Sequence, residues 1–338
     1  MLKKVLFTKS LRIVLVTLTI SFFGCNRNNV EKTSTTTTVS ADELTKNLPK
    51  VVVTTSVLCD LTSQIAQQTI NLTCLIPPNT NPLLYQPKPE DSKAIQQAKL
   101  ILYNGYNLEQ NFSGLIQESK NNELVVAVAQ RAVPKPLQFK EDATTVPDPY
   151  VWHNVKNTSS MVEVISSYLS KAAPENATLY KSNAKKITNE LAQLDAWINA
   201  RIESIPERQR QLITSRDAMG YYAKAYGLSY AGAVIGISNQ ETPTSQRSRA
   251  LIRFISKNRI PTVFVEATNN STFMNTLAEQ AEAKVSQRKL FADNLSAPGS
   301  EGESYQKMMV ANTRTIVEGL GGTYLIFLPK APQQPNQG

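Results

Sequence analysis

The stretch YKSNAKKITNELAQLDAWINARI, residues 180–202, decides how the rest of the chain is organised. It contains no glycine or proline, and its apolar residues recur at spacings of three, four or seven: Tyr180, Ile187, Leu191, Leu194, Ile198 and Ile202. This spacing is typical of one amphipathic helix. With its flanks it predicts a helix over residues 173–205, about thirty residues and roughly 45 Å long. A helix of that length has to cross most of the molecule.

On both sides of this helix, short β-branched or apolar runs alternate with helical stretches. The predicted strands are Val51–Ser56, Leu72–Ile76, Leu100–Tyr103, Gln211–Thr214, Tyr230–Ile235, Thr262–Val265 and Thr323–Leu328. Such alternation predicts parallel sheets that are covered by helices on both faces. The sequence therefore predicts an α/β fold with two Rossmann-like lobes, residues 49–172 and 206–330, joined by the long rigid helix.

The first residues predict export. Four basic residues precede an apolar stretch, Ile13–Phe23, that is too short to span a bilayer. They are Lys3, Lys4, Lys9 and Arg12. The stretch ends in Phe22-Phe23-Gly24-Cys25, which resembles a lipobox. Residues 1–24 are thus predicted to be a signal peptide, and Cys25 to carry the lipid that anchors an exported protein to a membrane. The alternative is plain secretion, with Cys25 inside the cleaved leader.

Both ends of the mature chain are predicted to lie outside the two lobes, and its net charge is modest. Residues 25–48 are polar and predict a disordered tether, and residues 331–338 predict a flexible tail. The formal charge of +9 falls to 9 − 4 = +5 without the four basic leader residues. No basic cluster is interleaved with aromatic residues, so a nucleic-acid partner is not predicted.

The remaining cysteines are Cys59 and Cys74, an even pair in a chain predicted to be exported. That compartment permits a disulfide. Cys59 falls in the first turn of a predicted helix and Cys74 in a predicted strand, and disulfide geometry is demanding. Two buried thiols fit the sequence equally well, so the pairing stays open.

A series of short motifs runs through both predicted lobes. They are Val53-Thr54-Thr55-Ser56, Ile76-Pro77-Pro78, Asn81-Pro82 with Tyr85-Gln86-Pro87, Leu102-Tyr103-Asn104-Gly105, Asp148-Pro149 with Val151-Trp152, Thr214-Ser215 with Asp217-Ala218, Glu241-Thr242-Pro243, Phe264-Val265-Glu266 and Asp293-Asn294-Leu295. In this order they resemble, from about Pro49 to Pro329, the solute-binding lipoproteins of manganese- and zinc-type ABC importers. The resemblance implies an extracytoplasmic protein that delivers Mn or Zn to a membrane permease.

The resemblance also implies where a metal site would lie. In that family the two lobes enclose one divalent cation, held by three histidines, or two histidines and a glutamate, plus an aspartate. Carried over, the histidine positions fall on Leu83 and on Tyr150, and the third ligand falls on Arg216. Only the aspartate is retained, as Asp293. Three of the four ligand positions are therefore replaced, and the site is degenerate.

The chemistry of these replacements argues against ordinary metal binding. Leu83 offers no lone pair, and the phenol of Tyr150 is a poor ligand while it keeps its proton. The guanidinium of Arg216 stays protonated and, at 4 Å with an effective dielectric of 20, would repel a dication by about 8 kcal/mol. We therefore expect a bidentate ion pair between Arg216 and Asp293 in place of the cation. The alternative is that Arg216 turns to solvent and Asp293 caps a neighbouring backbone.

Three more residues are candidates for supporting this site. Glu266 ends a predicted strand and is expected to accept a hydrogen bond from Arg216. Glu241 precedes a predicted helix, where a carboxylate favours the helix dipole. His153 is the only histidine of the chain. If residues 150–153 form a strand, its side chain points to the face opposite Tyr150 and away from the cleft. It could reach the cleft if the chain bends at His153-Asn154, where Asn154 or Asn157 could cap the next helix.

An enzyme is not predicted. The chain has no Gly-x-Ser-x-Gly elbow, no Gly-x-x-x-x-Gly-Lys phosphate loop and no His-Glu-x-x-His pair. Three hypotheses remain. The protein is a receptor of a metal importer that binds its cargo weakly or with a chelator, a metal-independent interaction or regulatory protein, or a module for a small anion or chelate drawn by Arg216 and Tyr150.

Overall fold

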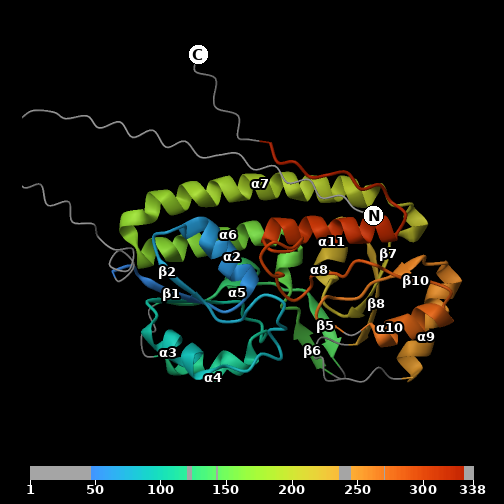
Figure 1. Cartoon of the computed structure of the whole chain (residues 1–338), viewed down its shortest axis with the longest axis horizontal. Helices are drawn as coiled ribbons and strands as arrows, with labels where there is room; N and C mark the ends of the chain where they lie inside the picture. Colours follow the sequence, from blue (N-terminus) through green and yellow to red (C-terminus); the bar gives the residue numbers. More distant parts are fainter. Residues whose placement is uncertain (1–46, 120–123, 142–143, 236–244, 270, 331–338) are drawn as a thin grey trace, which may run out of the picture. The chain divides into compact units, whose positions relative to one another are not determined.

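The computed structural model describes residues 47–119, 124–141, 144–235, 245–269 and 271–330 (Figure 1). All of them belong to one compact unit, Ala41–Gly338. The predicted signal peptide, the lipidation site Cys25, most of the tether, Glu241 and the predicted tail lie outside the described residues. In the described part of the chain, no helix is both long and apolar enough to cross a membrane.

The first lobe is built on a four-stranded parallel sheet in the order β2-β1-β3-β4. Its strands are β1 Lys50–Val53, β2 Asn71–Cys74, β3 Leu100–Tyr103 and β4 Val125–Ala127. The α-helices of this lobe are α2 Ser56–Ala66, α3 Pro89–Gln97, α4 Ser113–Glu118, α5 Val128–Ala132 and α6 Val155–Ala172. Its 3-10 turns are η1 Gln110–Phe112 and η3 Val151–His153. Val51 and Val53 join the core with α2 and α6, whereas Val52 packs toward α3 and α4. The central strands β1 and β3 are buried on both faces, because helices cover each side of the sheet, whereas the edge strand β2 is mostly exposed (Figure 1).

The second lobe has two parallel strand pairs. β7 Gln211–Arg216 pairs with β8 Ser229–Ile235, and β9 Thr262–Val263 pairs with β10 Lys284–Val285. A parallel bridge between Thr214 and Phe264 connects β7 to the second pair. The helices of this part are η5 Glu207–Gln209, α8 Gly220–Tyr226, α9 Ser245–Asn258, α10 Thr272–Gln280 and α11 Tyr305–Gly319. An antiparallel hairpin of the first lobe, β5 Gln138–Glu141 with β6 Thr144–Pro147, precedes η3.

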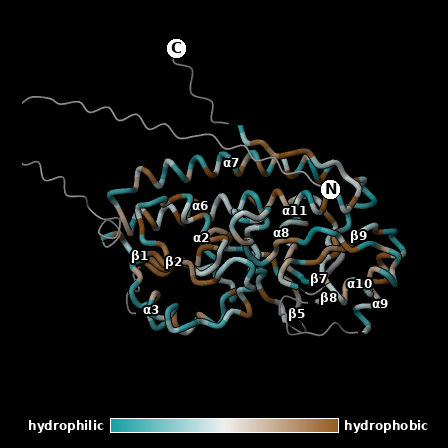
Figure 2. The backbone as a smooth tube through the Cα atoms, viewed as in Figure 1, coloured by the Kyte–Doolittle hydropathy of each residue, from teal (hydrophilic) through white to brown (hydrophobic). Residues whose placement is uncertain are grey.

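The long helix is present as α7, Ala177–Glu203, after a 3-10 turn η4 at Pro174–Asn176. Its 27 residues span about 40 Å at 1.5 Å per residue. It packs against α6 and α2 of the first lobe and against α11 and α8 of the second. Figure 2 shows the alternation of hydrophilic and hydrophobic residues along it. The predicted fold of two α/β lobes with one connecting helix is confirmed.

The predicted last strand, Thr323–Leu328, is wrong. This segment joins no sheet and runs instead beside α7, where the indole N–H of Trp197 donates to the carbonyl of Leu325 at 3.1 Å. The rings of Tyr324 and Phe327 contact the Trp197 ring. The short apolar run Tyr324–Leu328 that suggests a strand thus packs partly on a helix, and a run of this kind does not by itself distinguish helix packing from sheet pairing.

The structure resolves the open question of the two cysteines. Cys59 on α2 and Cys74 on β2 form a disulfide, with their Cα atoms 5.8 Å apart. β2 is an edge strand of the first sheet, so the bond ties that edge to the helix that covers it.

Candidate functional site

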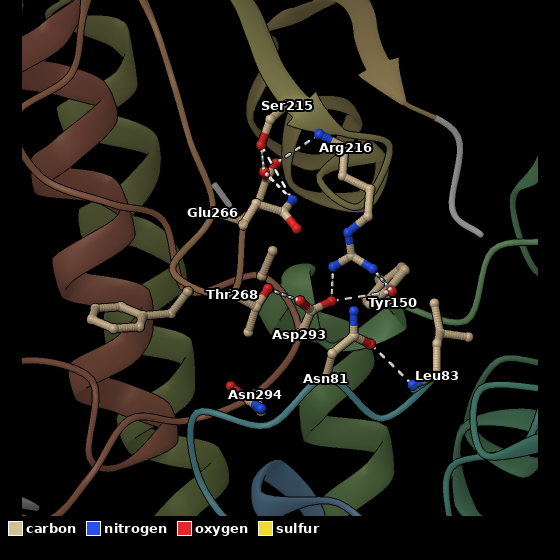
Figure 3. A network of polar contacts seen from close by, with 12 residues as sticks. Asn81, Leu83, Tyr150, Ser215, Arg216, Glu266, Thr268, Asp293 and Asn294 are labelled. Atoms are coloured by element: carbon tan, nitrogen blue, oxygen red, sulfur yellow. Dashed lines mark hydrogen bonds and ion pairs between the residues drawn. The ribbon is translucent and has the colours of Figure 1, made fainter. Parts of the chain in front are cut away.

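The four residues that the family resemblance assigns to metal-ligand positions lie close together, at the ends of strands and in loops of both lobes. Arg216 is the last residue of β7, while Glu266 and Asp293 lie on segments that follow β9 and β10. The first lobe contributes Tyr150, directly before η3, and the loop that carries Leu83. The carboxyl ends of parallel strands are the usual place for ligands in α/β folds. Figure 3 shows these side chains converging.

The guanidinium of Arg216 is fully buried between the lobes. It forms an ion pair with Asp293 through Nη2 and donates from Nη1 to the hydroxyl of Tyr150 at 2.7 Å. Its Cζ lies 5.3 Å from the centroid of the Tyr150 ring. The predicted ion pair between Arg216 and Asp293 is present, but it is not bidentate, because Nη2 contacts the carboxylate while Nη1 bonds Tyr150. Arg216 is fully buried, so the alternative in which it turns to solvent is excluded.

Asp293 is held on both carboxylate oxygens. The Tyr150 hydroxyl donates to its Oδ1 at 3.2 Å, and the Thr268 hydroxyl donates to its Oδ2. Burial raises the pKa of Tyr150 above its usual value in spite of the neighbouring Arg216 charge. The phenol therefore keeps its proton, accepts from the arginine and donates to the aspartate (Figure 3).

Glu266 supports the site through the backbone of β7. Its Oε1 accepts the backbone N–H of Arg216 at 3.1 Å, and its Oε2 accepts from the Ser215 hydroxyl and from Nδ2 of Asn269, the latter at 3.0 Å. Its bond to Arg216 is thus made with the main chain. The effect is to fix the end of β7 from which the guanidinium projects.

The segment around Tyr150 is not the strand that was predicted. Residues Val151–His153 form the 3-10 turn η3, and the Asn154 side chain accepts from Lys156 N–H to cap α6. Because a 3-10 turn does not alternate its side chains, His153 does not face away from the cleft. Its Nε2 donates to the carbonyl of Ala292 at 2.8 Å, next to Asp293. Burial lowers the pKa of His153 to about 4, so the ring is neutral.

Two aspartates that were quoted only as parts of motifs lie beside this network. Asp148 Oδ1 accepts the backbone N–H of Tyr150 at 2.9 Å, and burial, together with the charge of Asp217, raises the pKa of Asp148 to about 8. Burial also raises the pKa of Asp217. Asp148 therefore holds Tyr150 in place as a largely protonated acid at neutral pH.

The loop with the lost histidine position covers the remaining side. Asn81 is buried, and its Oδ1 accepts the backbone N–H of Leu83 at 3.0 Å. The side chain of Leu83 packs against the main hydrophobic core. In Figure 3 both residues lie across the ion pair from Glu266. An apolar side chain thus stands where a ligand is expected.

Besides the contacts of Arg216, other hydrogen bonds connect the first lobe to the second. Asn79 N–H donates to Leu295 O (2.9 Å), Leu295 N–H to Ser56 Oγ (2.9 Å), Tyr305 N–H to Asp60 Oδ2 (2.8 Å) and Leu137 N–H to Tyr221 Oη (2.8 Å). Because Arg216, Tyr150 and Asp293 are each at most 1% exposed, solvent does not reach the pair.

The donor set does not suit a metal. Among the described residues, no three histidine, cysteine, aspartate or glutamate side chains gather as they would around an ion. Thr268, Ser215 and Asn269 were missed as members of the network, since hydroxyls and amides in a loop carry no recognisable spacing. Glu241 lies outside the described residues.

Comparison with known proteins places this geometry in context. Residues 51–319 match the model of the ZnuA family, the periplasmic component A of a zinc-uptake complex. The manganese ABC transporter substrate-binding lipoprotein PsaA of Streptococcus mitis is 32% identical over 277 residues, 80% of this chain and 89% of that protein. The manganese-binding lipoprotein MntA of Halalkalibacterium halodurans is 31% identical over 271 residues, 80% of this chain and 88% of that protein.

Solved structures agree with the sequence relatives. The periplasmic zinc-binding protein TroA of Treponema pallidum has a TM-score of 0.75 and 29% identity, over 81% of this chain and 99% of that one. Fe(III)-bound YtgA of Chlamydia trachomatis has a TM-score of 0.73 and 25% identity, over 82% of this chain and 99% of that one.

Proposed function

The chain belongs to the ZnuA family and is a substrate-binding protein of the manganese- and zinc-type metal ABC transporters, and we propose that its cleft is closed by an internal cation, the Arg216 guanidinium, instead of a metal ion. The observation that carries this proposal is the fully buried ion pair between Arg216 and Asp293. A divalent ion entering the cleft would meet a fixed positive charge and a carboxylate that is already paired.

The contacts favour a metal-independent role over the two alternatives. A weakly bound metal would have to displace a guanidinium that also bonds Tyr150. A small anion in the cleft would compete with Asp293 for the Arg216 guanidinium, whose charge the Asp293 carboxylate already balances. The hydrogen bonds between the lobes are all made by groups of the protein itself, without a bound solute. We therefore propose that, within this family of substrate-binding proteins, the chain acts as an interaction or regulatory protein whose body stays closed without a bound metal.

Partners and location follow by family analogy. Relatives at 31–32% identity are named lipoproteins of ABC transporters. We infer that Cys25 carries a lipid, that the body stands outside the cytoplasmic membrane on its tether, and that its partner is an importer permease. Radiolabelled palmitate incorporated by the natural chain but not by Cys25→Ala would support this assignment, and equal labelling of both would overturn it.

Metal titration tests the proposal directly. Chelator-treated protein is titrated with Mn²⁺ and Zn²⁺ by calorimetry, and no saturable heat is expected with either ion. The fluorescence of Trp152 gives a second measure of binding, because the centroid of its ring lies 5.3 Å from that of the Tyr150 ring in the site. Micromolar or tighter binding of either metal would overturn the proposal.

A gain-of-function variant tests whether the replaced ligands are the reason that no metal is expected to bind. Leu83→His, Tyr150→His and Arg216→His combined restore three ligands beside Asp293 and should gain Zn²⁺ binding. The matched control is Arg216→Gln alone, which removes the charge without supplying imidazoles and should not gain it. If the control binds as tightly as the triple variant, the lost ligands are not what prevents binding.

A further inference from the structure

A pocket of about 360 Å³ lies apart from the ion pair, where the beginning of α6, the middle of α7 and the helix α8 meet. Its wall includes Lys135 from the segment before β5, Lys156 from the first turn of α6 and Lys224 from α8. The first two lysines belong to the first lobe and the third to the second lobe. The pocket therefore spans the seam between the lobes.

The pocket carries more positive than negative charge. Asp195 is its one acidic lining residue; its Oδ2 lies 3.8 Å from Nζ of Lys156, and its Oδ1 accepts from the Tyr226 hydroxyl at 3.1 Å. Asp195 therefore offsets one lysine. Lys135 and Lys224 are exposed, and none of the ion pairs between described residues involves either of them. Two ammonium groups on opposite sides of the seam remain for a ligand.

Uncharged groups in the wall also favour an anion. The hydroxyl oxygen of Tyr221 accepts the backbone N–H of Leu137 at 2.8 Å, which leaves its own O–H to donate. Burial raises the pKa of Tyr221 to about 12, so that proton is retained at neutral pH. The 18-residue helix α6 begins at this wall, and its N-terminus carries the positive end of the helix dipole.

We propose that this pocket binds a compact small molecule with two or more negatively charged oxygens, a polycarboxylate or a phosphate, held between Lys135 and Lys224. The volume lies at the lower end of the range of about 300–1,000 Å³ that small-molecule sites occupy. Lysine is a point charge without the planar fork of arginine, so the pocket selects for charge more than for the shape of the oxyanion. A ligand bound there bridges the two lobes and stabilises their closed arrangement. This inference does not depend on the state of the Arg216 pair.

Calorimetric titration with citrate and with inorganic phosphate, at low and at high ionic strength, tests the pocket. We expect saturable binding of at least one probe to the natural chain and weaker binding at high salt, since the lysines are exposed. The double variant Lys135→Ala and Lys224→Ala should lose about tenfold in affinity per lysine, which corresponds to about 1.4 kcal/mol each.

The matched control is the double variant Lys99→Ala and Lys257→Ala, which removes one exposed lysine from each lobe away from the pocket. It should bind as the natural chain does. The probe that binds more tightly identifies the ligand class as carboxylate or phosphate. The proposal is overturned if neither probe gives saturable heat, or if the pocket variant and the control variant bind equally.

Discussion

The Tyr150 hydroxyl accepts a hydrogen bond from the Arg216 guanidinium at 2.7 Å, and this bond joins the first lobe to the second. The same hydroxyl donates to Asp293, so one tyrosine contacts both partners of a buried ion pair. Through these two bonds a residue of the first lobe holds both members of an ion pair that belongs to the second lobe.

Breaking the ion pair from its acidic side should be costly. In Asp293→Asn the buried Arg216 keeps its charge and loses its counter-ion, and we expect a loss of about 3–5 kcal/mol in the free energy of unfolding. Urea denaturation measures it. The control replaces both partners, Arg216→Met with Asp293→Leu, and should recover most of the loss because no unpaired charge remains. A cost below about 1 kcal/mol for Asp293→Asn would contradict a strong buried pair.

His153 should make the protein less stable in mild acid. Burial lowers its pKa in the folded chain to about 4 from 6.5, so the unfolded chain binds more protons between these values and stability falls as pH drops through this window. From pH 7 to pH 5 the natural chain should lose about 2 kcal/mol more than His153→Gln, measured by urea denaturation at both pH values. Parallel losses in the two proteins would contradict the assignment.

Asp148 should act in the opposite direction. Its pKa of about 8 in the folded chain lies above the usual 3.8, so the folded chain holds the extra proton and stability falls as pH rises between these values. Asp148→Asn keeps an oxygen for the Tyr150 N–H and does not titrate. From pH 5 to pH 7 the natural chain should therefore lose about 3 kcal/mol relative to this variant. The same urea series measures this loss, and the absence of any difference from the variant between pH 5 and pH 7 would show that Asp148 is already ionised in the folded chain.

The disulfide should contribute to stability without touching the site. The bond between Cys59 and Cys74 closes a loop with a sequence separation of 15, for which chain entropy predicts about 3 kcal/mol. The variant Cys59→Ala with Cys74→Ala should unfold at lower urea by that amount. A reductant should weaken the natural chain and leave the variant unchanged; equal sensitivity of both would show that the thiols are not bonded.

Much of the fold could be predicted because periodicity is a local property of the chain. The spacing of apolar residues over 180–202 predicts α7, and the β-branched run at Val51–Val53 predicts the central strand β1. The strand predicted at Thr323–Leu328 is wrong because a short apolar run can pack on the side of a helix as well as pair in a sheet. At Tyr150 a 3-10 turn replaced the expected strand, and the direction of His153 changed with it.

The amino-acid sequence by itself determined which residues stand at the positions compared with the family's ligands, Leu83, Tyr150 and Arg216, because residue identity needs no coordinates. Only the tertiary structure decided where the arginine goes: chain segments 77 residues apart place Arg216 and Asp293 in contact, sealed from water. The physical reason is that a buried charge requires a partner, and which partner is within reach depends on how the two lobes close, a distance that no local pattern encodes.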